Sequence, residues 1–185
     1  NVKKNYSFPL TLTASLTRKL TKNEFKNIGS PKEWGVLPIR PMGATVRITK
    51  DKRILIRNTA ELQNPNSFSD ENLNQRRKIH VIGIHKRFPR LPKNIIESTW
   101  SGVVCRSRNG SQIFEKISKN IFVAGCYNGS GIGTGTFFGE QIALMASNQD
   151  SDKLNIIENR DKPIKLPTKA LLNIGVYTRL IYERL

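Results

Sequence analysis

The sequence from residue 120 to residue 146 reads NIFVAGCYNGSGIGTGTFFGEQIALMA and combines three local patterns. Residues 121–124 are a short apolar run that is typical of a buried strand, and apolar side chains recur at helical spacing after residue 136. Between these segments lie five glycines, which we call the glycine turn: Gly125, Gly129, Gly131, Gly133 and Gly135. Because glycine has no Cβ, this backbone can adopt positive φ and can lie close to a flat or phosphorylated group.

The start of the helix after the glycine turn is a candidate cofactor site. The first N–H groups of a helix have no intrahelical acceptor and carry the positive end of its dipole, which suits an electron-rich ligand atom. The spacing does not fit a Rossmann fingerprint, because the third glycine falls on Thr134 or Thr136, and no Gly-Lys-Ser/Thr sequence follows. The alternative is a tight strand-to-helix connection whose small residues serve packing.

The composition fits a folded chain of one or two domains. The 185 residues are 37% hydrophobic, and no apolar run approaches the roughly 20 residues of a membrane span. Cys105 and Cys126 lack a CxxC motif, so we expect reduced thiols, neither a disulfide nor a metal site, and a cytoplasmic protein. The first residues, NVKKN, include no Met and no apolar signal segment, so we expect a cut or processed end.

The formal charge of +17 favours a different class of function, a nucleic-acid-binding module. However, the basic residues are spread through all predicted elements, and no run of five of them occurs. The sequence also has no helix-turn-helix or zinc-finger signature. We therefore expect a solvated basic surface and no nucleic-acid partner.

Hydropathy and turn signals predict the remaining elements. Thr21 and Glu24 have the spacing of a capping box, so a short helix should run to about Asn27, and Ser69 can cap a helix over about 70–86. Five strands are expected, over 5–17, 35–40, 44–49, 53–58 and 95–105, with a turn at 41–43. A polar linker from residue 150 should precede a helix over 169–183 that Gly175 interrupts.

The helix over 70–86 should turn Leu73, His80, Val81 and Ile84 inward. His80 and His85 are five residues apart, so they do not share a helix face as a metal-binding pair at i and i+4 would. We interpret them as packing or surface histidines.

Four segments, in their order along the chain, carry a family resemblance. They are Trp34-Gly35 followed by residues 43–59 (GATVRITKDKRILIRNT), residues 85–91 (HKRFPRL), Trp100-Ser101-Gly102 with Ser107-Arg108-Asn109, and the glycine turn with Gly139 and Ala143. Together they resemble the C-terminal part of flavoproteins of the D-amino acid oxidase family. The resemblance is greatest to its bacterial branch of D-amino acid dehydrogenase-like and glycine oxidase-like enzymes, and it spans nearly all 185 residues.

The resemblance implies an α+β fold in three parts. Residues 1–104 would form a substrate-domain-like antiparallel sheet with flanking helices, 105–150 the C-terminal strand-turn-helix piece of an FAD-binding domain, and 151–185 a linker and C-terminal helix. In the family, the βαβ unit that binds the FAD pyrophosphate lies at the N-terminus, and nothing in this sequence supplies it. We therefore expect the C-terminal portion of an FAD-dependent oxidoreductase. Its partner would be the N-terminal FAD-binding portion of the same enzyme, without which it should be inactive.

The resemblance also implies the chemistry and the site. An amine or amino acid would transfer a hydride to FAD, and backbone N–H groups at the helix start would stabilise the charge on the reduced flavin. The implied FAD-binding residues are Gly129, Ser130, Gly131, Ile132, Gly133 and Thr134. Trp100 and Tyr127 are candidate substrate-lining residues, and Arg47 is a possible partner for an anionic group. For these three the alternatives are core packing and a solvated strand face.

Two departures from the family pattern bear on the substrate. Glycine oxidase-like relatives carry a carboxylate-binding arginine two residues after the Trp-x-Gly triplet, where this chain has Val104. An arginine that some relatives carry in the glycine turn is also absent, because Cys126, Tyr127 and Asn128 precede Gly129. The substrate could therefore be a neutral or polyamine-like amine, or an amino acid whose carboxylate is bound by other residues. A separate alternative is a domain that has lost the cofactor and serves only protein interaction.

Overall fold

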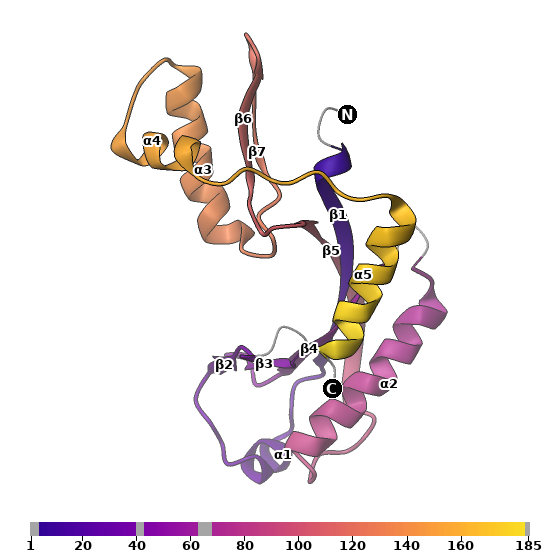
Figure 1. The fold of residues 1–185 in the computed structure, drawn as a ribbon. Coiled ribbons are helices and arrows are strands. Elements are labelled where there is room, and N and C mark those ends of the chain that lie inside the picture. Colours follow the sequence, from indigo (N-terminus) through magenta and orange to yellow (C-terminus); the bar gives the residue numbers. More distant parts are fainter. Residues whose placement is uncertain (1–3, 40–42, 63–67, 184–185) are drawn as a thin grey trace. The chain divides into compact units, whose positions relative to one another are not determined.

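The structure is a computed structural model, and it describes residues 4–39, 43–62 and 68–183. The chain divides into two compact units (Figure 1). The first unit contains residues 1–10 and 104–172, and the second contains residues 11–103 and 173–185. The chain passes from the second unit to the first between Val103 and Val104.

The second unit is built on a five-stranded sheet in the order β2-β3-β4-β1-β5. The strands are β1 (Ser7–Thr17), β2 (Trp34–Val36), β3 (Thr45–Ile48), β4 (Ile54–Glu61) and β5 (Ile96–Ser107), of which residues 7–10 and 104–107 belong to the first unit. A 3-10 turn, η1 (Lys4–Tyr6), precedes β1. The pairs β2 with β3, β3 with β4, and β1 with β4 are all antiparallel. This confirms the predicted α+β class with a mainly antiparallel sheet.

Side-chain caps set the starts of the helices in this unit. In α1 (Lys22–Asn27) the Thr21 hydroxyl accepts from the Glu24 N–H and the Glu24 carboxylate accepts from the Thr21 N–H, which is the predicted capping box. In α2 (Asp70–Arg87) Ser69 and Asn72 make the same reciprocal pair. The two helices end at Asn27 and Arg87, within one residue of the predicted ends.

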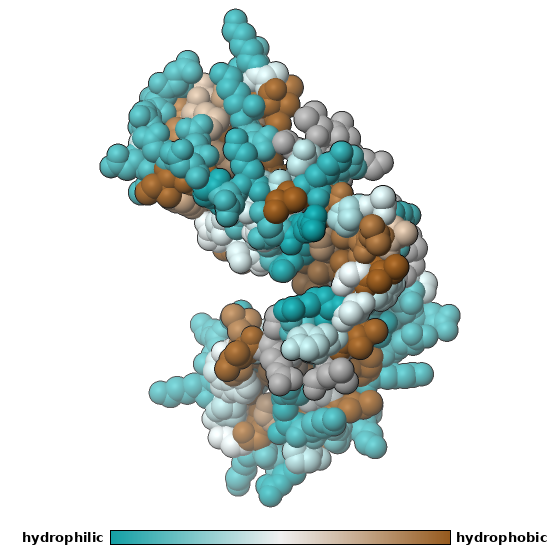
Figure 2. Space-filling view, in the orientation of Figure 1, coloured by the Kyte–Doolittle hydropathy of each residue, from teal (hydrophilic) through white to brown (hydrophobic). Residues whose placement is uncertain are grey.

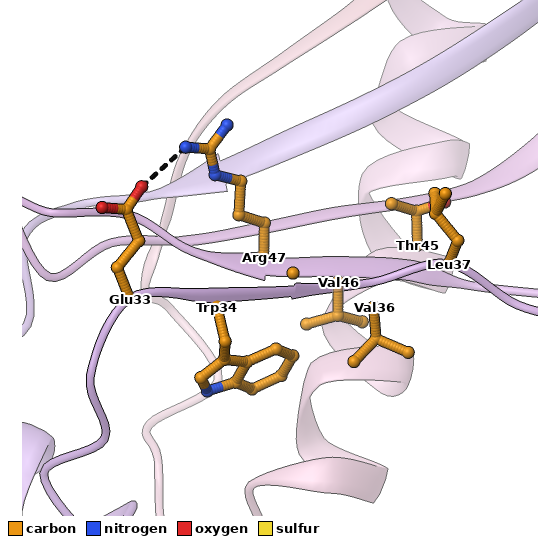
Figure 3. A pocket seen from close by; sticks show the side chains of 8 residues that line it. Glu33, Trp34, Val36, Leu37, Thr45, Val46 and Arg47 are labelled. Atoms are coloured by element: carbon orange, nitrogen blue, oxygen red, sulfur yellow. Dashed lines mark hydrogen bonds and ion pairs between the residues drawn. The ribbon is translucent and has the colours of Figure 1, made fainter.

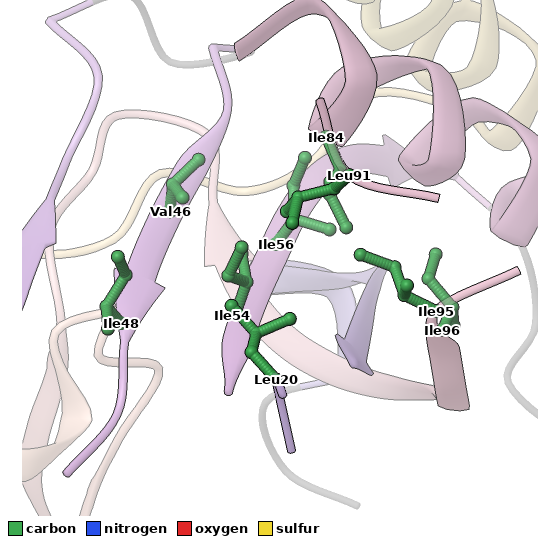
Figure 4. Close-up of a cluster of buried hydrophobic side chains, with 9 residues drawn as sticks. All are labelled: Leu20, Val46, Ile48, Ile54, Ile56, Ile84, Leu91, Ile95 and Ile96. Carbon is green, nitrogen blue, oxygen red and sulfur yellow. The ribbon is translucent and has the colours of Figure 1, made fainter. Parts of the chain in front are cut away.

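The core of the second unit lies between the sheet and α2 (Figure 4). It consists of buried aliphatic side chains from the sheet, from α2 and from the segments that connect the elements: Leu20, Val46, Ile48, Ile54, Ile56, Ile84, Leu91, Ile95 and Ile96. On β1, however, the buried face carries hydroxyls at residues 11, 13, 15 and 17. Ser15 Oγ lies 2.7 Å from Nδ1 of the fully buried His80 and 2.8 Å from Thr99 Oγ1. His80 is thus a packing residue, as predicted.

The first unit packs a hairpin against two helices. The hairpin pairs β6 (Ile113–Ser118) with β7 (Ile121–Gly125), and α3 (Gly131–Ala146) and α4 (Asp152–Asn159) follow. Phe114, Phe138, Leu154 and Ile157 form its buried core, with the Phe114 and Phe138 rings edge to face at 5.3 Å. The sequence therefore predicted β7 and α3 correctly.

Other elements differ from the prediction. The sequence did not predict β6, and α4 lies where a polar linker was predicted, capped by the Ser151 hydroxyl that accepts from the Leu154 N–H. The last helix, α5 (Lys169–Tyr182), continues through Gly175 without interruption, because helical packing tolerates an isolated glycine. β2 ends at Val36, so residues 37–39 are not part of a strand, and the predicted turn at 41–43 falls largely outside the described residues.

Candidate functional site

The backbone of the glycine turn reverses sharply between β7 and α3. Cys126 and Asn128 both have φ of 56°, and Gly129 has φ of 98°. Positive φ favours glycine and, among other residues, asparagine, so Asn128 and Gly129 suit their positions. Of the five glycines in the turn, Gly129 alone needs this freedom, since the other four have ordinary φ values.

The side chain of Asn128 holds the turn in place. Its Nδ2 donates to the carbonyls of Gly110 and Cys126 at 2.8 and 2.9 Å, and its Oδ1 accepts from the Ser107 N–H at 2.9 Å. The backbone oxygen of Asn128 accepts from Arg106 Nη1, also at 2.9 Å. One side chain thus ties the turn to the end of β5 and to the loop after it.

The N-terminus of α3 presents unpaired backbone donors. Its N-cap residue, Ser130, makes no side-chain cap hydrogen bond. The Ser130 N–H donates to the Tyr127 carbonyl at 2.9 Å, and the Thr134 N–H donates to the Ser130 carbonyl at 3.3 Å. The N–H groups of Gly131, Ile132 and Gly133 have no acceptor within the described residues. The Ile132 side chain is 93% exposed, so nothing in the described chain covers this helix end.

The glycines of the turn have two kinds of surroundings. A Cβ at Gly131 or Gly135 would meet the Tyr127 ring at 3.6 and 3.4 Å respectively, which is ordinary van der Waals contact. A Cβ at Gly129 or Gly133 would have no heavy atom within 4 Å. Contacts within the described chain therefore do not require glycine at Gly131, Gly133 or Gly135.

Tyr127 lies in the first unit, beside the helix start. Its half-buried ring meets the Phe138 ring edge to face at 5.9 Å, and its hydroxyl makes no hydrogen bond to any described residue. The ring therefore packs against α3, while the hydroxyl has its hydrogen-bonding capacity free.

Arg47 and Trp100 lie in the second unit. Arg47 lines an open pocket of about 460 Å³ at the β2 edge of the sheet and forms a 2.7 Å ion pair with Glu33 (Figure 3). Both partners are exposed, so the Glu33 carboxylate and the surrounding solvent together stabilise the charge of Arg47. Trp100 is 42% exposed on β5. The preceding residue, Thr99, contacts the Ser15 hydroxyl, so strand alternation places Trp100 on the opposite face of the sheet.

Arg57 is a candidate anion-binding residue that the sequence did not lead us to predict. It lies on β4 directly opposite Thr45 in the register, and its Nη2 donates to Thr45 Oγ1 at 2.9 Å. Because Ile56 faces the core with Ser15, strand alternation places Arg57 on the sheet face away from α2, as it does Arg47 and Trp100. No carboxylate pairs with Arg57 among the described residues. The sequence did contain a signal for Arg57, because it takes an outward-facing position in one strand of the predicted hairpin, as Arg47 does in the other.

Both cysteines are free thiols in the first unit, and no group of metal-ligating side chains occurs among the described residues. Cys105 is exposed and Cys126 is buried. Burial raises the pKa of the Cys126 thiol to about 12. Among the described helices, none has the length and apolar character to cross a membrane.

Comparisons with known proteins agree with one another. Residues 7–145 match the model of the DAO family, described as FAD dependent oxidoreductase. Glycine oxidase from Geobacillus kaustophilus superposes with a TM-score of 0.58 at 14% identity, over 80% of this chain and 37% of that one. L-proline dehydrogenase from P. horikoshii does so with 0.55 at 16% identity, over 86% of this chain and 42% of that one. The chain thus spans less than half of either enzyme, and no curated protein matches it.

Proposed function

Since the chain belongs to the DAO family of FAD dependent oxidoreductases, we propose that it is the C-terminal portion of an enzyme that oxidises an amine or amino acid by hydride transfer to FAD. One observation carries this proposal: three backbone N–H groups at the start of α3 point to no acceptor in the described chain, beside a glycine with open space around it. The structural relatives, named as a glycine oxidase and a proline dehydrogenase, favour an amino acid as substrate.

The proposed FAD-binding residues are those around the helix start: Gly129, Ser130, Gly131, Ile132, Gly133 and Thr134. The unpaired donors fit the electron-rich edge of a ring, and the absence of a Cβ at Gly133 leaves room for it. FAD supplies the hydride acceptor, and the protein supplies orientation and electrostatic stabilisation. The N–H groups of Gly131, Ile132 and Gly133, at the positive end of the helix dipole, would stabilise negative charge on that edge.

The proposed substrate-binding residues are Arg47, Trp100 and Tyr127, to which we add Arg57. The free hydroxyl of Tyr127 and the exposed ring of Trp100 support their roles. Arg57 is a better candidate than Arg47 for binding a substrate carboxylate, because Glu33 already neutralises Arg47.

The remaining parts of the proposal concern the rest of the enzyme. Its N-terminal portion would bind the FAD pyrophosphate and would be the partner of this chain. We place the enzyme in the cytoplasm, since both cysteines are free thiols.

The visible spectrum of the complete purified enzyme tests the proposal. We expect flavin absorption bands that disappear on unfolding, and bleaching under anaerobic conditions by at least one member of a panel of amino acids and amines. A colourless complete enzyme that takes up no FAD would contradict the proposal and favour a cofactor-free interaction domain.

Nucleic-acid binding is the second candidate, because the net charge is +17. Hydrophilic residues cover much of the surface in Figure 2, and several arginines of the second unit pair with carboxylates, as in Arg18 with Glu24 and Arg179 with Glu183. A salt titration of DNA affinity separates the two candidates. A submicromolar affinity whose logarithm falls steeply with the logarithm of the salt concentration would favour nucleic-acid binding. We expect only weak, non-specific retention of DNA.

A further inference from the structure

Three segments of the second unit that are distant in sequence meet at one end of it. The Leu20 N–H donates to the Lys52 carbonyl at 3.0 Å, which joins the approach to α1 to the turn between β3 and β4. The Arg18 N–H donates to the Ile95 carbonyl at 2.8 Å, which joins the same approach to the loop before β5. The helix α1 lies beside the C-terminal end of α2 (Figure 1). We call these segments the basic end: residues 18–27, 49–53 and 86–97.

The basic end has a large excess of positive charge. Its segments contain eleven Lys and Arg and three acidic residues. All three carboxylates are already paired. Glu24 pairs with Arg18 at 2.7 Å, and Asp51 and Glu97 both pair with Arg53. Six exposed lysines, in contrast, have no carboxylate partner among the described residues: Lys22, Lys26, Lys50, Lys52, Lys86 and Lys93. The fold thus gathers charge that the sequence shows only as scattered residues.

Hydrogen bonds fix the elements that carry these lysines. The helix α1 begins at its capping box. In the turn after β3, the Thr49 hydroxyl donates to Asp51 Oδ1 at 2.6 Å and accepts from the Arg53 N–H at 3.0 Å. Lys52 Nζ from this turn lies 5.0 Å from the centroid of the Phe25 ring on α1. The turn and the helix therefore present their lysines on one continuous surface.

We propose that the basic end binds the surface of a membrane that contains anionic lipids. Lysine carries a compact charge on a flexible stem, which suits lipid head groups that move laterally. Clusters of about 4–8 basic residues attract anionic lipids, and each residue near the surface increases partitioning about fivefold. This function goes beyond flavin-dependent oxidation and does not depend on it.

Nucleic acid fits this surface less well. Proteins bind single strands through exposed aromatic rings on which the bases stack. The aromatic rings of the basic end, Phe25 and Phe88, are half-buried and pack against the core. A duplex is read by an element that enters a groove, and α1 has only 6 residues. The lysines come instead from three segments of different conformation, so they form a broad charged area that suits a flat anionic surface.

Co-sedimentation of the complete enzyme with lipid vesicles tests the proposal. We expect the enzyme to sediment at low salt with vesicles of phosphatidylcholine and phosphatidylserine, and not with vesicles of phosphatidylcholine alone. Salt at about 1 M should release the enzyme, because the Debye length falls to about 3 Å. An enzyme that stays in solution with both kinds of vesicle, or that binds both kinds equally, would overturn the proposal.

A double variant tests whether the basic end is the surface that binds. The changes Lys22→Gln and Lys50→Gln remove one lysine from α1 and one from the turn, so partitioning onto phosphatidylserine vesicles should fall about 25-fold. The control is Lys116→Gln with Lys119→Gln, which removes the same charge from exposed lysines of the β6–β7 hairpin in the first unit. The control should partition as the wild type does. Equal losses in the two variants would show an effect of net charge alone and would contradict the proposal.

Duplex DNA separates a lipid surface from nucleic acid as the partner. We expect the wild-type enzyme to bind DNA more weakly than phosphatidylserine vesicles in the same buffer. Tighter binding to DNA that is lost with Lys22→Gln and Lys50→Gln would make the basic end a nucleic-acid site, and the proposal would be wrong. Circular dichroism of each variant shows that a loss of binding is not a loss of fold.

Discussion

The ring of Tyr127 lies against Gly135, where a Cβ would stand 3.4 Å from the ring atom Cε2. The same ring covers Gly131 one turn earlier and meets Phe138 edge to face. The first turn of α3 is thus held against the residue that precedes the positive-φ pair of Asn128 and Gly129. The position of the unpaired N–H groups depends on this contact.

Gly135→Val tests the contact. The Cβ would already be in van der Waals contact with the Tyr127 ring, so we expect the two γ-methyl groups of valine to overpack it, which costs about 1–3 kcal/mol of unfolding free energy. Gly139→Val is the matched control, because it lies in the same helix and a Cβ there meets no heavy atom within 4 Å. Urea unfolding of the complete enzyme measures both variants. Equal midpoints would show that the ring moves aside without cost.

Asn128→Asp tests the side chain that clamps the turn. The substitution keeps the acceptor for the Ser107 N–H but replaces two donors with an oxygen facing the carbonyls of Gly110 and Cys126. Leaving such groups unsatisfied costs about 1–3 kcal/mol each, so both stability and FAD affinity should fall. Asn128→Gly, which suits positive φ, is expected to lose stability through the clamp alone. Unchanged FAD affinity in both variants would mean that the clamp does not position the turn.

Arg57→Met tests the choice between the two arginines of the outer sheet face. Loss of a hydrogen-bonded charge costs about 1.5–3 kcal/mol, so KM for an amino acid substrate should rise about 10- to 100-fold. Arg47→Met should change KM little, because Glu33 compensates Arg47 in solvent. A substrate amine that lacks a carboxylate should respond to neither substitution. A larger effect of Arg47→Met on the amino acid would reverse the assignment.

The buried His80 predicts a specific dependence of stability on pH. Burial lowers its pKa from 6.5 to about 4, and the nearby Arg76 guanidinium adds to this. The folded state therefore binds its proton less readily than the unfolded state does. Stability should be complete above pH 6.5 and should decline by about 3 kcal/mol as pH falls toward 4. The variant His80→Asn should lack this decline in urea unfolding, and a parallel decline in both proteins would assign it to other groups.

Local signals in the sequence were sufficient for much of the fold. The caps at Thr21 and Ser69 satisfy helix N–H groups within their own segment, so their spacing alone predicts where α1 and α2 begin. The β3 and β4 strands form a hairpin whose alternation matches a single buried face. The glycine turn was found for the same reason, since its strand, turn and helix are contiguous.

Features that depend on tertiary contacts were not predictable. Alternation identified β1 as a strand, but hydropathy gives no sign that its hydroxyl face is the buried one, which requires His80 from α2 and Thr99 from β5. The polar sequence of α4 is helical because Leu154 and Ile157 bury against Phe114 and Phe138. Only the folded structure shows that Glu33 pairs with Arg47, whereas no carboxylate among the described residues pairs with Arg57.

The most direct measurement of the cofactor site is the FAD content and the flavin reduction potential of the complete enzyme with Gly133→Val. A Cβ at Gly133 has open space in this chain, so the substitution disturbs only a group bound at the helix start. Gly139→Val, with equally open surroundings in the same helix, is the control. We expect Gly133→Val to lose FAD or to lower the reduction potential of the flavin, while Gly139→Val retains both. Normal FAD content and reduction potential in Gly133→Val would show that the turn serves packing and that the cofactor binds elsewhere.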